Sequence, residues 1–147
     1  MKISRILFDT SMPAKRWFFG WLPLWVASYL VVQGALLTPE EIPAWFIHLN
    51  DKVVHGIEYA LLFLAAVNAF YRAVWTWIHA HVARNGLIYC AVLGAVTECL
   101  QFLVPGRGVA FTDWLADVSG ACLGMLVWKI VQRIRPAGES FKTGVVA

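Results

Sequence analysis

The residues of this chain that could carry out chemistry gather in one stretch, from Glu98 to Gly124. Among runs of Leu, Val, Ala and Trp, this stretch holds two aspartates, a glutamate, a glutamine and an arginine. Pro105-Gly106 interrupts it, and the acidic groups on both sides lie near the break. An ionisable group at the centre of a membrane span costs roughly 2.5–3.5 kcal/mol, so such groups are usually functional or paired. The pattern therefore predicts two membrane-spanning helices joined by a tight turn, with polar side chains at the end where the turn lies.

A second polar group, Asp51, Lys52, His55 and Glu58, opens an earlier apolar run. At a helical rise of 1.5 Å per residue, His55 would lie roughly 6 Å and Glu58 about 10 Å inside the span. The same count, made from the Pro105 side, places the polar residues of the next two runs at roughly 6–12 Å, namely Gln101, Glu98, Asp113 and Asp117. Three helices are therefore expected to place their polar residues in one layer.

The helical faces agree with this layer. His55 and Glu58 share a side of their helix, as do Glu98 and Gln101. Asp113 and Asp117 share a side of the following helix with a small-xxx-small pair, Gly120 and Gly124, which would allow close helix packing. We expect Arg107, in the intervening turn, to reach over the acidic layer as a counter-ion.

The elements that must position these residues follow from the composition. The chain has 147 residues, of which 60% are hydrophobic and 14% charged, with a mean hydropathy of +0.66. Soluble domains are about 45–50% apolar and about 25% charged, so a membrane protein is expected. The apolar runs are 17–37, 53–71, 86–104 and 109–128. They predict an all-α bundle of four transmembrane helices (residues 17–132), with an N-terminal segment (1–16) and a tail (133–147).

The basic residues predict the orientation of the bundle. Of the twelve Lys and Arg residues, ten lie in the N-terminal segment, the Arg72–Arg84 loop and the C-terminal segment, and two lie on the other side. Because positively charged segments stay in the cytoplasm, both termini should be cytoplasmic and the polar layer should face outward. The predicted location is the cytoplasmic (inner) membrane of the cell, with multiple passes.

Few partners or cofactors are indicated. The net charge of +3 without a basic run gives no nucleic-acid footprint, so the expected partners are membrane lipids. The three cysteines lie inside apolar runs and lack CxxC spacing, which favours buried small hydrophobic residues over metal ligands or disulfides. We expect no metal site on this basis, and the sequence indicates neither a cofactor nor an oligomeric state.

The polar motifs together resemble the VanZ-like family of small membrane proteins. The resemblance covers about half of the chain, from Asp51 to Gly124, and rests on these matching positions: Asp51, Lys52, His55, Glu98, Gln101, Arg107, Asp113 and Gly120. The chain departs from the family pattern at Asp117, where Asn is common. Glu58 matches no position of the family motif, and it is a candidate site residue only because of its predicted depth in the span. The resemblance implies a polytopic membrane protein, whose namesake is linked to low-level teicoplanin resistance.

Three functions remain open. The first is a protein that binds or modifies a lipid-linked or peptidoglycan-type envelope ligand through Asp51, Lys52, Glu58, Gln101, Arg107 and Asp117, and so contributes to glycopeptide resistance. The second is a membrane hydrolase or transferase that uses His55, Glu98 and Asp113 in acid–base or metal-assisted catalysis. An ion- or proton-coupled carrier ranks last, because Asn68 is the only polar residue expected in the inner half.

Overall fold

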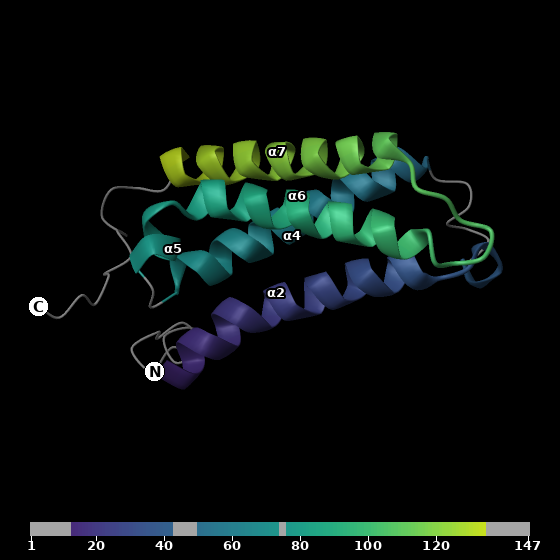
Figure 1. Cartoon of the computed structure of the whole chain (residues 1–147). Coiled ribbons are helices and arrows are strands. Elements are labelled where there is room, and N and C mark those ends of the chain that lie inside the picture. The colour runs from purple at the N-terminus through teal and green to yellow at the C-terminus, as the bar shows by residue number, and fades with distance from the viewer. Residues whose placement is uncertain (1–12, 43–49, 74–75, 135–147) are drawn as a thin grey trace, which may run out of the picture.

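The computed structural model describes residues 13–42, 50–73 and 76–134, and within these ranges the chain is helical and contains no strand. The elements in chain order are α2 (Pro13–Leu36), the short 3-10 helix η1 (Pro39–Glu41), α4 (Asp51–Tyr71), α5 (Thr76–Ala80), α6 (Val82–Gln101) and α7 (Phe111–Ile134). The four long helices lie side by side, with the start of α2 and the end of α7 at the same end of the bundle (Figure 1). The all-α prediction is confirmed.

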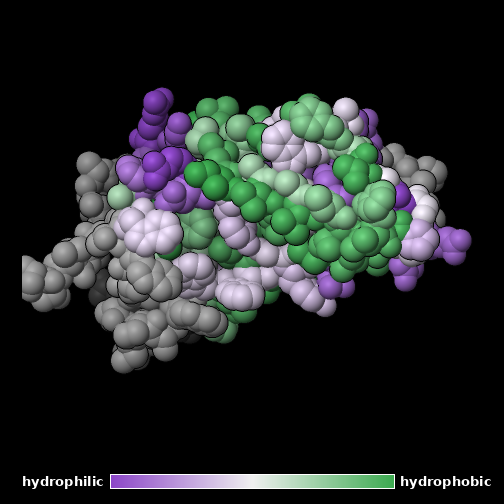
Figure 2. Space-filling view, viewed as in Figure 1, coloured by the Kyte–Doolittle hydropathy of each residue, from purple (hydrophilic) through white to green (hydrophobic). Residues whose placement is uncertain are grey.

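Three of these helices are long and apolar enough to cross a membrane: Phe18–Leu36, Asp51–Tyr71 and Phe111–Ile134. Hydrophobic residues gather over the middle of the molecule and hydrophilic residues near its two ends (Figure 2). This banding matches an apolar layer between two aqueous surfaces. The remaining predicted span, run 86–104, corresponds to α6, whose polar residues, Glu98 and Gln101 among them, lower its hydropathy.

The helices extend beyond the predicted apolar runs. The fourth run was expected to end at Trp128, but α7 continues to Ile134. Lys129 and Arg133 lower the hydropathy there while remaining good helix formers, so the apolar run ends before the helix does. Likewise, the expected loop from Arg72 to Arg84 contains α5 and the first turn of α6. Most of the predicted terminal segments, residues 1–12 and 135–147, lie outside the described ranges.

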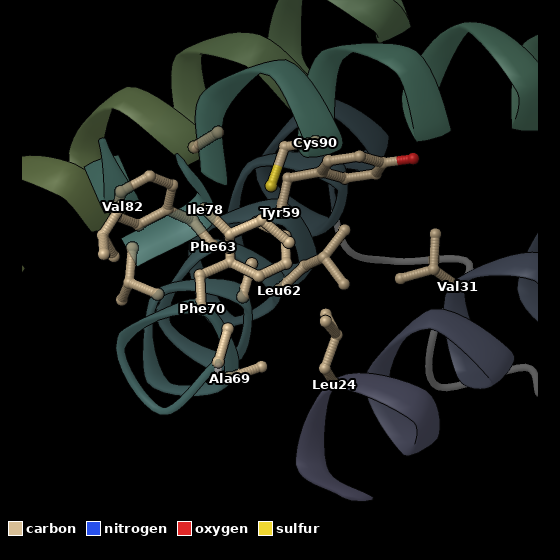
Figure 3. Close-up of a cluster of buried hydrophobic side chains, with 14 residues drawn as sticks. Leu24, Val31, Tyr59, Leu62, Phe63, Ala69, Phe70, Ile78, Val82 and Cys90 are labelled. Carbon is tan, nitrogen blue, oxygen red and sulfur yellow. The ribbon is translucent and has the colours of Figure 1, made fainter. Parts of the chain in front are cut away.

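Helix α4 is the centre of the bundle and packs against α2, α6 and α7. Its buried residues recur at helical spacing and include Tyr59, Leu62, Phe63 and Ala66, which are at most 1% exposed. Figure 3 shows this cluster with Leu24 of α2 on one side and Cys90 of α6 on the other, together with further buried side chains. Cys90 is a buried core residue, whereas Cys99 and Cys122 lie on the exterior.

Glycines bring α7 close to α4. A Cβ atom on Gly120 would lie 2.7 Å from the Cα of Gly56, and one on Gly124 would lie 2.7 Å from the carbonyl oxygen of Ala60. Both positions therefore need a residue without a side chain. The small-xxx-small stripe predicted from the sequence is the surface on which the two helices meet.

Asn68 compensates for the proline inside α2. Pro23 has no N–H, so the carbonyl of Phe19, four residues earlier, lacks its usual helical donor. The Asn68 Nδ2 atom donates a hydrogen bond to that carbonyl oxygen at 2.8 Å. The side chain of α4 thus supplies the bond that the backbone of α2 cannot make, as an apolar surrounding requires.

The connection from α6 to α7 contains a tight turn. Gly106 has φ +79, and the Arg107 N–H donates to the Val104 carbonyl at 3.1 Å. Proline followed by a glycine with positive φ is the combination that a type II turn requires. The turn packs near η1, since a Cβ on Gly106 would lie 3.5 Å from Pro39.

The short helix η1 is closed by its own side chains. The Thr38 N–H and hydroxyl both donate to Glu41 Oε2, at 2.8 and 2.9 Å. These two hydrogen bonds stabilise the carboxylate and hold the pKa of Glu41 below its usual value. Ile42, directly after η1, lines the cavity described below.

Candidate functional site

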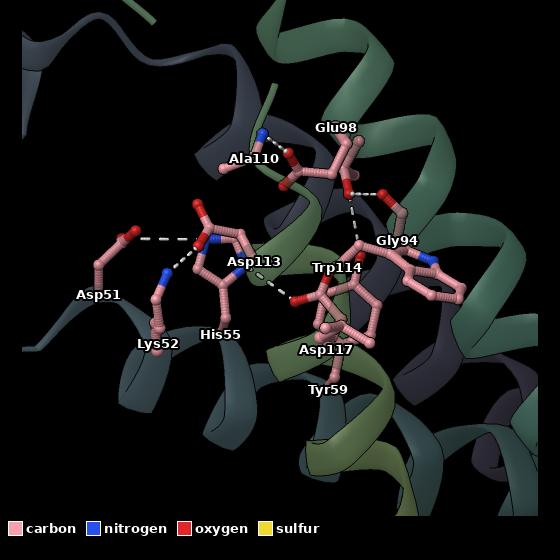
Figure 4. Close-up of polar contacts among 12 residues, drawn as sticks. Asp51, Lys52, His55, Tyr59, Gly94, Glu98, Ala110, Asp113, Trp114 and Asp117 are labelled. Carbon is pink, nitrogen blue, oxygen red and sulfur yellow. Dashed lines mark hydrogen bonds and ion pairs between the residues drawn. The ribbon is translucent and has the colours of Figure 1, made fainter. Parts of the chain in front are cut away.

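The predicted polar residues meet at one end of the bundle, where α2 and α6 end and α4 and α7 begin. Figure 4 shows Asp51, Lys52 and His55 from α4 facing Asp113 and Asp117 from α7, with Glu98 of α6 beside them. In each of these helices the polar side chains come from the turns nearest this end, so they lie at similar positions along the length of the bundle. The structure places His55 near Asp113 in one group of side chains and near Glu98 in another.

The outermost contact is an ion pair between the first turns of α4 and α7. Lys52 Nζ lies 2.5 Å from Asp113 Oδ1 and 3.0 Å from Thr112 Oγ1. The lysine side chain is 53% exposed and the aspartate 12%, so solvent screens this pair in part. Lys52 is therefore the cation that neutralises a carboxylate of the cluster.

One turn deeper, His55 is held by a buried carboxylate. His55 Nδ1 lies 2.8 Å from Asp117 Oδ1, and His55 Nε2 lies 3.8 Å from Asp51 Oδ1. The Asp117 side chain is 0% exposed because it lies between His55 of α4 and Gly94 of α6. This contact fixes the orientation of the imidazole ring.

Glu98 connects α6 to the beginning of α7. Its Oε2 atom accepts a hydrogen bond from the Ala110 N–H at 2.9 Å, next to the first residue of α7. A carboxylate is favourable there because the N-terminus of a helix carries a partial positive charge. Glu98 Oε1 and Asp117 Oδ2 are buried and have no hydrogen-bond partner within the described part of the chain.

A second polar network lies directly below the carboxylates. The hydroxyls of Tyr59 and Thr97 are 3.0 Å apart, and Thr97 Oγ1 donates to the Gly94 carbonyl at 2.9 Å. Trp114 Nε1 donates to the Ala91 carbonyl at 3.0 Å. Sequence reasoning missed Thr97 and Trp114, because a lone hydroxyl in an apolar run and a membrane tryptophan both have common packing explanations.

Arg107 occupies a different position from the one predicted. Its NH1 group donates to the carbonyl oxygens of Gly34 and Ala35, at 2.9 and 3.2 Å, at the end of α2. The last carbonyls of a helix lack helical donors and carry a partial negative charge, which a guanidinium satisfies. Arg107 forms no ion pair with a carboxylate among the described residues, so the predicted counter-ion contact is replaced by a cap on α2.

A cavity of about 390 Å³ opens between α2, α4 and the turn that carries Arg107. Its apolar wall comes mainly from α2 and includes Leu30, Val31 and Leu37, and its polar wall consists of Gln33, Asp51, His55, Glu58, Tyr59, Thr97, Gln101 and Arg107. Glu58 and Gln101 make no side-chain hydrogen bond to another described residue. Their polar groups are therefore available to a molecule in the cavity.

Two sets of three side chains could hold a metal ion. One is Asp51, His55 and Asp113, and the other is His55, Glu98 and Asp117. In each set, one ligand atom from each residue lies within 4.8 Å of the others. Residues predicted for catalysis and for ligand binding thus share one cluster, whereas Glu58, Gln101 and Arg107 line the adjoining cavity.

The fold and this cluster are those of a helical bundle in which three helices could span a membrane, consistent with a multi-pass membrane protein, and which carries a polar cluster at one end. The chain belongs to the VanZ/LLP1 family, whose sequence model matches residues 6–132. The resemblance predicted from the motifs is confirmed and extends well beyond the Asp51–Gly124 segment. No curated protein and no solved structure gives a significant match to the chain.

Proposed function

We propose that this protein binds the headgroup of a lipid-linked envelope ligand in the cavity between α2 and α4, at the outer face of the inner membrane. The ligand class is a peptidoglycan-type precursor, in which a lipid carries a diphosphate, sugars and a peptide. Its hydrocarbon portion would contact the apolar wall, and its headgroup would contact the polar wall.

The orientation in this proposal needs α6 as a fourth span and cytoplasmic termini. Helix α6 packs against α4 and α7, which are both apolar enough to span a membrane, and the described chain ends lie at one end of the bundle. The opposite end carries the cluster. Basic residues concentrate at the end with the termini, which supports a cytoplasmic position for that end.

The observation that carries the proposal is the division of the cavity into two walls. Leu30 and Val31 offer hydrocarbon, whereas Glu58 and Gln101 offer polar groups that make no hydrogen bond to another described side chain or backbone group. Arg107 uses NH1 on α2 and retains its other N–H groups for a phosphate oxygen. A headgroup that carries both an anionic diphosphate and a peptide amine complements Arg107 and Glu58 together.

The test is binding of a defined lipid to the full chain in nanodiscs of neutral phospholipid. The probes are a polyprenyl diphosphate that carries an amino-sugar peptide and the same diphosphate without the peptide, with tryptophan fluorescence as the readout. We expect saturable binding of the peptide-bearing probe. Glu58→Gln should weaken it at least about tenfold, or roughly 1.4 kcal/mol, while changing the affinity for the plain diphosphate much less.

Gln101→Leu should weaken the binding of both probes. Ser119→Ala is the matched control, because the Ser119 hydroxyl is exposed and donates a hydrogen bond to the Leu115 carbonyl of its own helix. Absence of saturable binding, or equal affinities for all variants, would refute the proposal. A contribution to glycopeptide resistance is tested separately, by expressing wild type and Glu58→Gln in a teicoplanin-sensitive strain. The proposal expects protection from the wild type only.

A membrane hydrolase or transferase is the second candidate, favoured by the contact between His55 and Asp117. A histidine oriented by a buried carboxylate is a common arrangement for general acid–base catalysis. Of the three predicted catalytic residues, Glu98 is bonded to the start of α7 and Asp113 to Lys52, so His55 is the best base. Phosphate or peptide release from the bound probe, abolished by His55→Asn, would support catalysis.

The carrier has the least support. A through-path needs polar groups in both halves of the bundle. Asn68, the polar residue expected in the other half, uses its amide to satisfy the carbonyl that Pro23 leaves without a donor.

A further inference from the structure

The two buried carboxylate oxygens without partners, Glu98 Oε1 and Asp117 Oδ2, lie in the same cluster as His55. Glu98 is 4% exposed and Asp117 0%. A buried polar atom without a partner costs about 1–3 kcal/mol, and more when it is charged. The two carboxylates share a group with one imidazole, and each has an oxygen without a partner, which indicates that the protein binds something there that satisfies both carboxylates.

We propose that His55, Glu98 and Asp117 bind one divalent transition-metal ion of the Mn²⁺ or Zn²⁺ type. One ligand atom from each of the three lies within 4.8 Å of the others, which is close enough for all three to contact one ion. The two carboxylates would balance the charge of the ion. Binding of the ion does not require the ligand proposed for the neighbouring cavity.

The alternative set, Asp51, His55 and Asp113, is less suitable. Asp113 Oδ1 is already bonded to Lys52 Nζ, and the positive charge of that lysine would repel a cation. The Asp51 side chain is 66% exposed, so water already hydrates it. Within the described ranges, no Lys or Arg contacts the deeper set, and this set has the partnerless oxygens.

The chemistry of the ligands selects the type of ion. Carboxylates alone favour Mg²⁺ or Ca²⁺, whereas an imidazole ligand favours transition metals such as Zn²⁺. Three protein ligands would leave at least one coordination position open. Because His55 also lines the cavity, that open position would face a molecule bound there.

The experiment uses the full chain in detergent micelles, stripped with EDTA and titrated with Mn²⁺. Loss of the electron paramagnetic resonance signal of free Mn²⁺ reports binding. Mn²⁺ is preferred to Zn²⁺ because the exposed thiols of Cys99 and Cys122 bind Zn²⁺ far more readily. We expect one ion per chain, and an electron spin echo modulation from imidazole nitrogen. Because the chain has four histidines, His55→Asn must abolish this modulation if His55 is the ligand.

Asp117→Asn and Glu98→Gln should each weaken Mn²⁺ binding at least about tenfold, since even outer-shell changes cost about 10–100-fold. Asp113→Asn, in the other set, should bind nearly as the wild type does. Circular dichroism and gel filtration show which variants are folded. Lack of Mn²⁺ binding by the wild type, lack of the nitrogen modulation, or a greater loss in Asp113→Asn would each overturn the proposal.

Discussion

The contact between Gly120 and Gly56 links the packing of the bundle to the geometry of the site. Gly120→Ala would place a Cβ atom 2.7 Å from the Cα of Gly56. Carbon atoms in contact need about 3.5–4.0 Å, so α7 and α4 must separate by about 1 Å locally. Backbone lies on the opposing side, so no flexible side chain can move away instead.

This separation of the two helices has two consequences. Overpacking of this kind costs about 1–3 kcal/mol of stability. In addition, Asp117 lies one turn before Gly120 and His55 directly precedes Gly56, so their 2.8 Å hydrogen bond would lengthen beyond the limit of about 3.2 Å. Gly120→Ala should therefore destabilise the fold and also disconnect His55 from its carboxylate.

The assay is unfolding of the purified chain in mixed micelles by increasing sodium dodecyl sulfate, followed by tryptophan fluorescence. Gly34→Ala in α2 is the matched control, because no atom lies within 4 Å of its Cβ position. Alanine is a better helix former than glycine by up to about 1 kcal/mol, so the control should be unchanged or more stable. The two substitutions are chemically identical, yet only Gly120→Ala is expected to lower stability.

A Gly120→Ala protein that unfolds at the wild-type detergent concentration would refute this reasoning. So would a variant that loses stability while Mn²⁺ or lipid binding at the site stays unchanged, because the separation would then not reach His55.

Further substitutions test the contacts between α2 and the rest of the bundle. Asn68→Leu should destabilise the fold by about 1–3 kcal/mol because the Phe19 carbonyl loses its donor, and Pro23→Ala should restore much of that loss by supplying a backbone N–H. Detergent unfolding of the two single variants and the double variant measures this coupling, and additive effects would contradict it. Arg107→Gln should lower stability by about 0.3–1 kcal/mol through loss of charge at the end of α2, and Arg107→Lys should lower it less. Equal effects of these two substitutions in the same assay would argue against a charge-based cap.

The sequence alone predicted much of the site, because depth in a helical span depends only on distance along the chain. Counting residues from Asp51, Pro105 and the start of the last run predicts one layer for His55, Glu98 and Asp113. In the structure His55 lies in one group with Asp51 and Asp113 and in a second group with Glu98 and Asp117. Hydropathy also predicted the all-helical bundle. It placed the end of α7 too early, because exposed basic residues continue a helix without continuing an apolar run.

Which side chains contact each other within this layer could be learned only from the tertiary structure. Sequence spacing gives the height and face of a side chain, but helix rotation and separation decide which atom it meets. Arg107 caps α2 rather than neutralising an acid, Lys52 pairs with Asp113, and Glu98 bonds to the start of α7 while one of its oxygens has no partner among the described residues. These contacts join residues far apart in the chain, and close packing through glycine is what sets their distances.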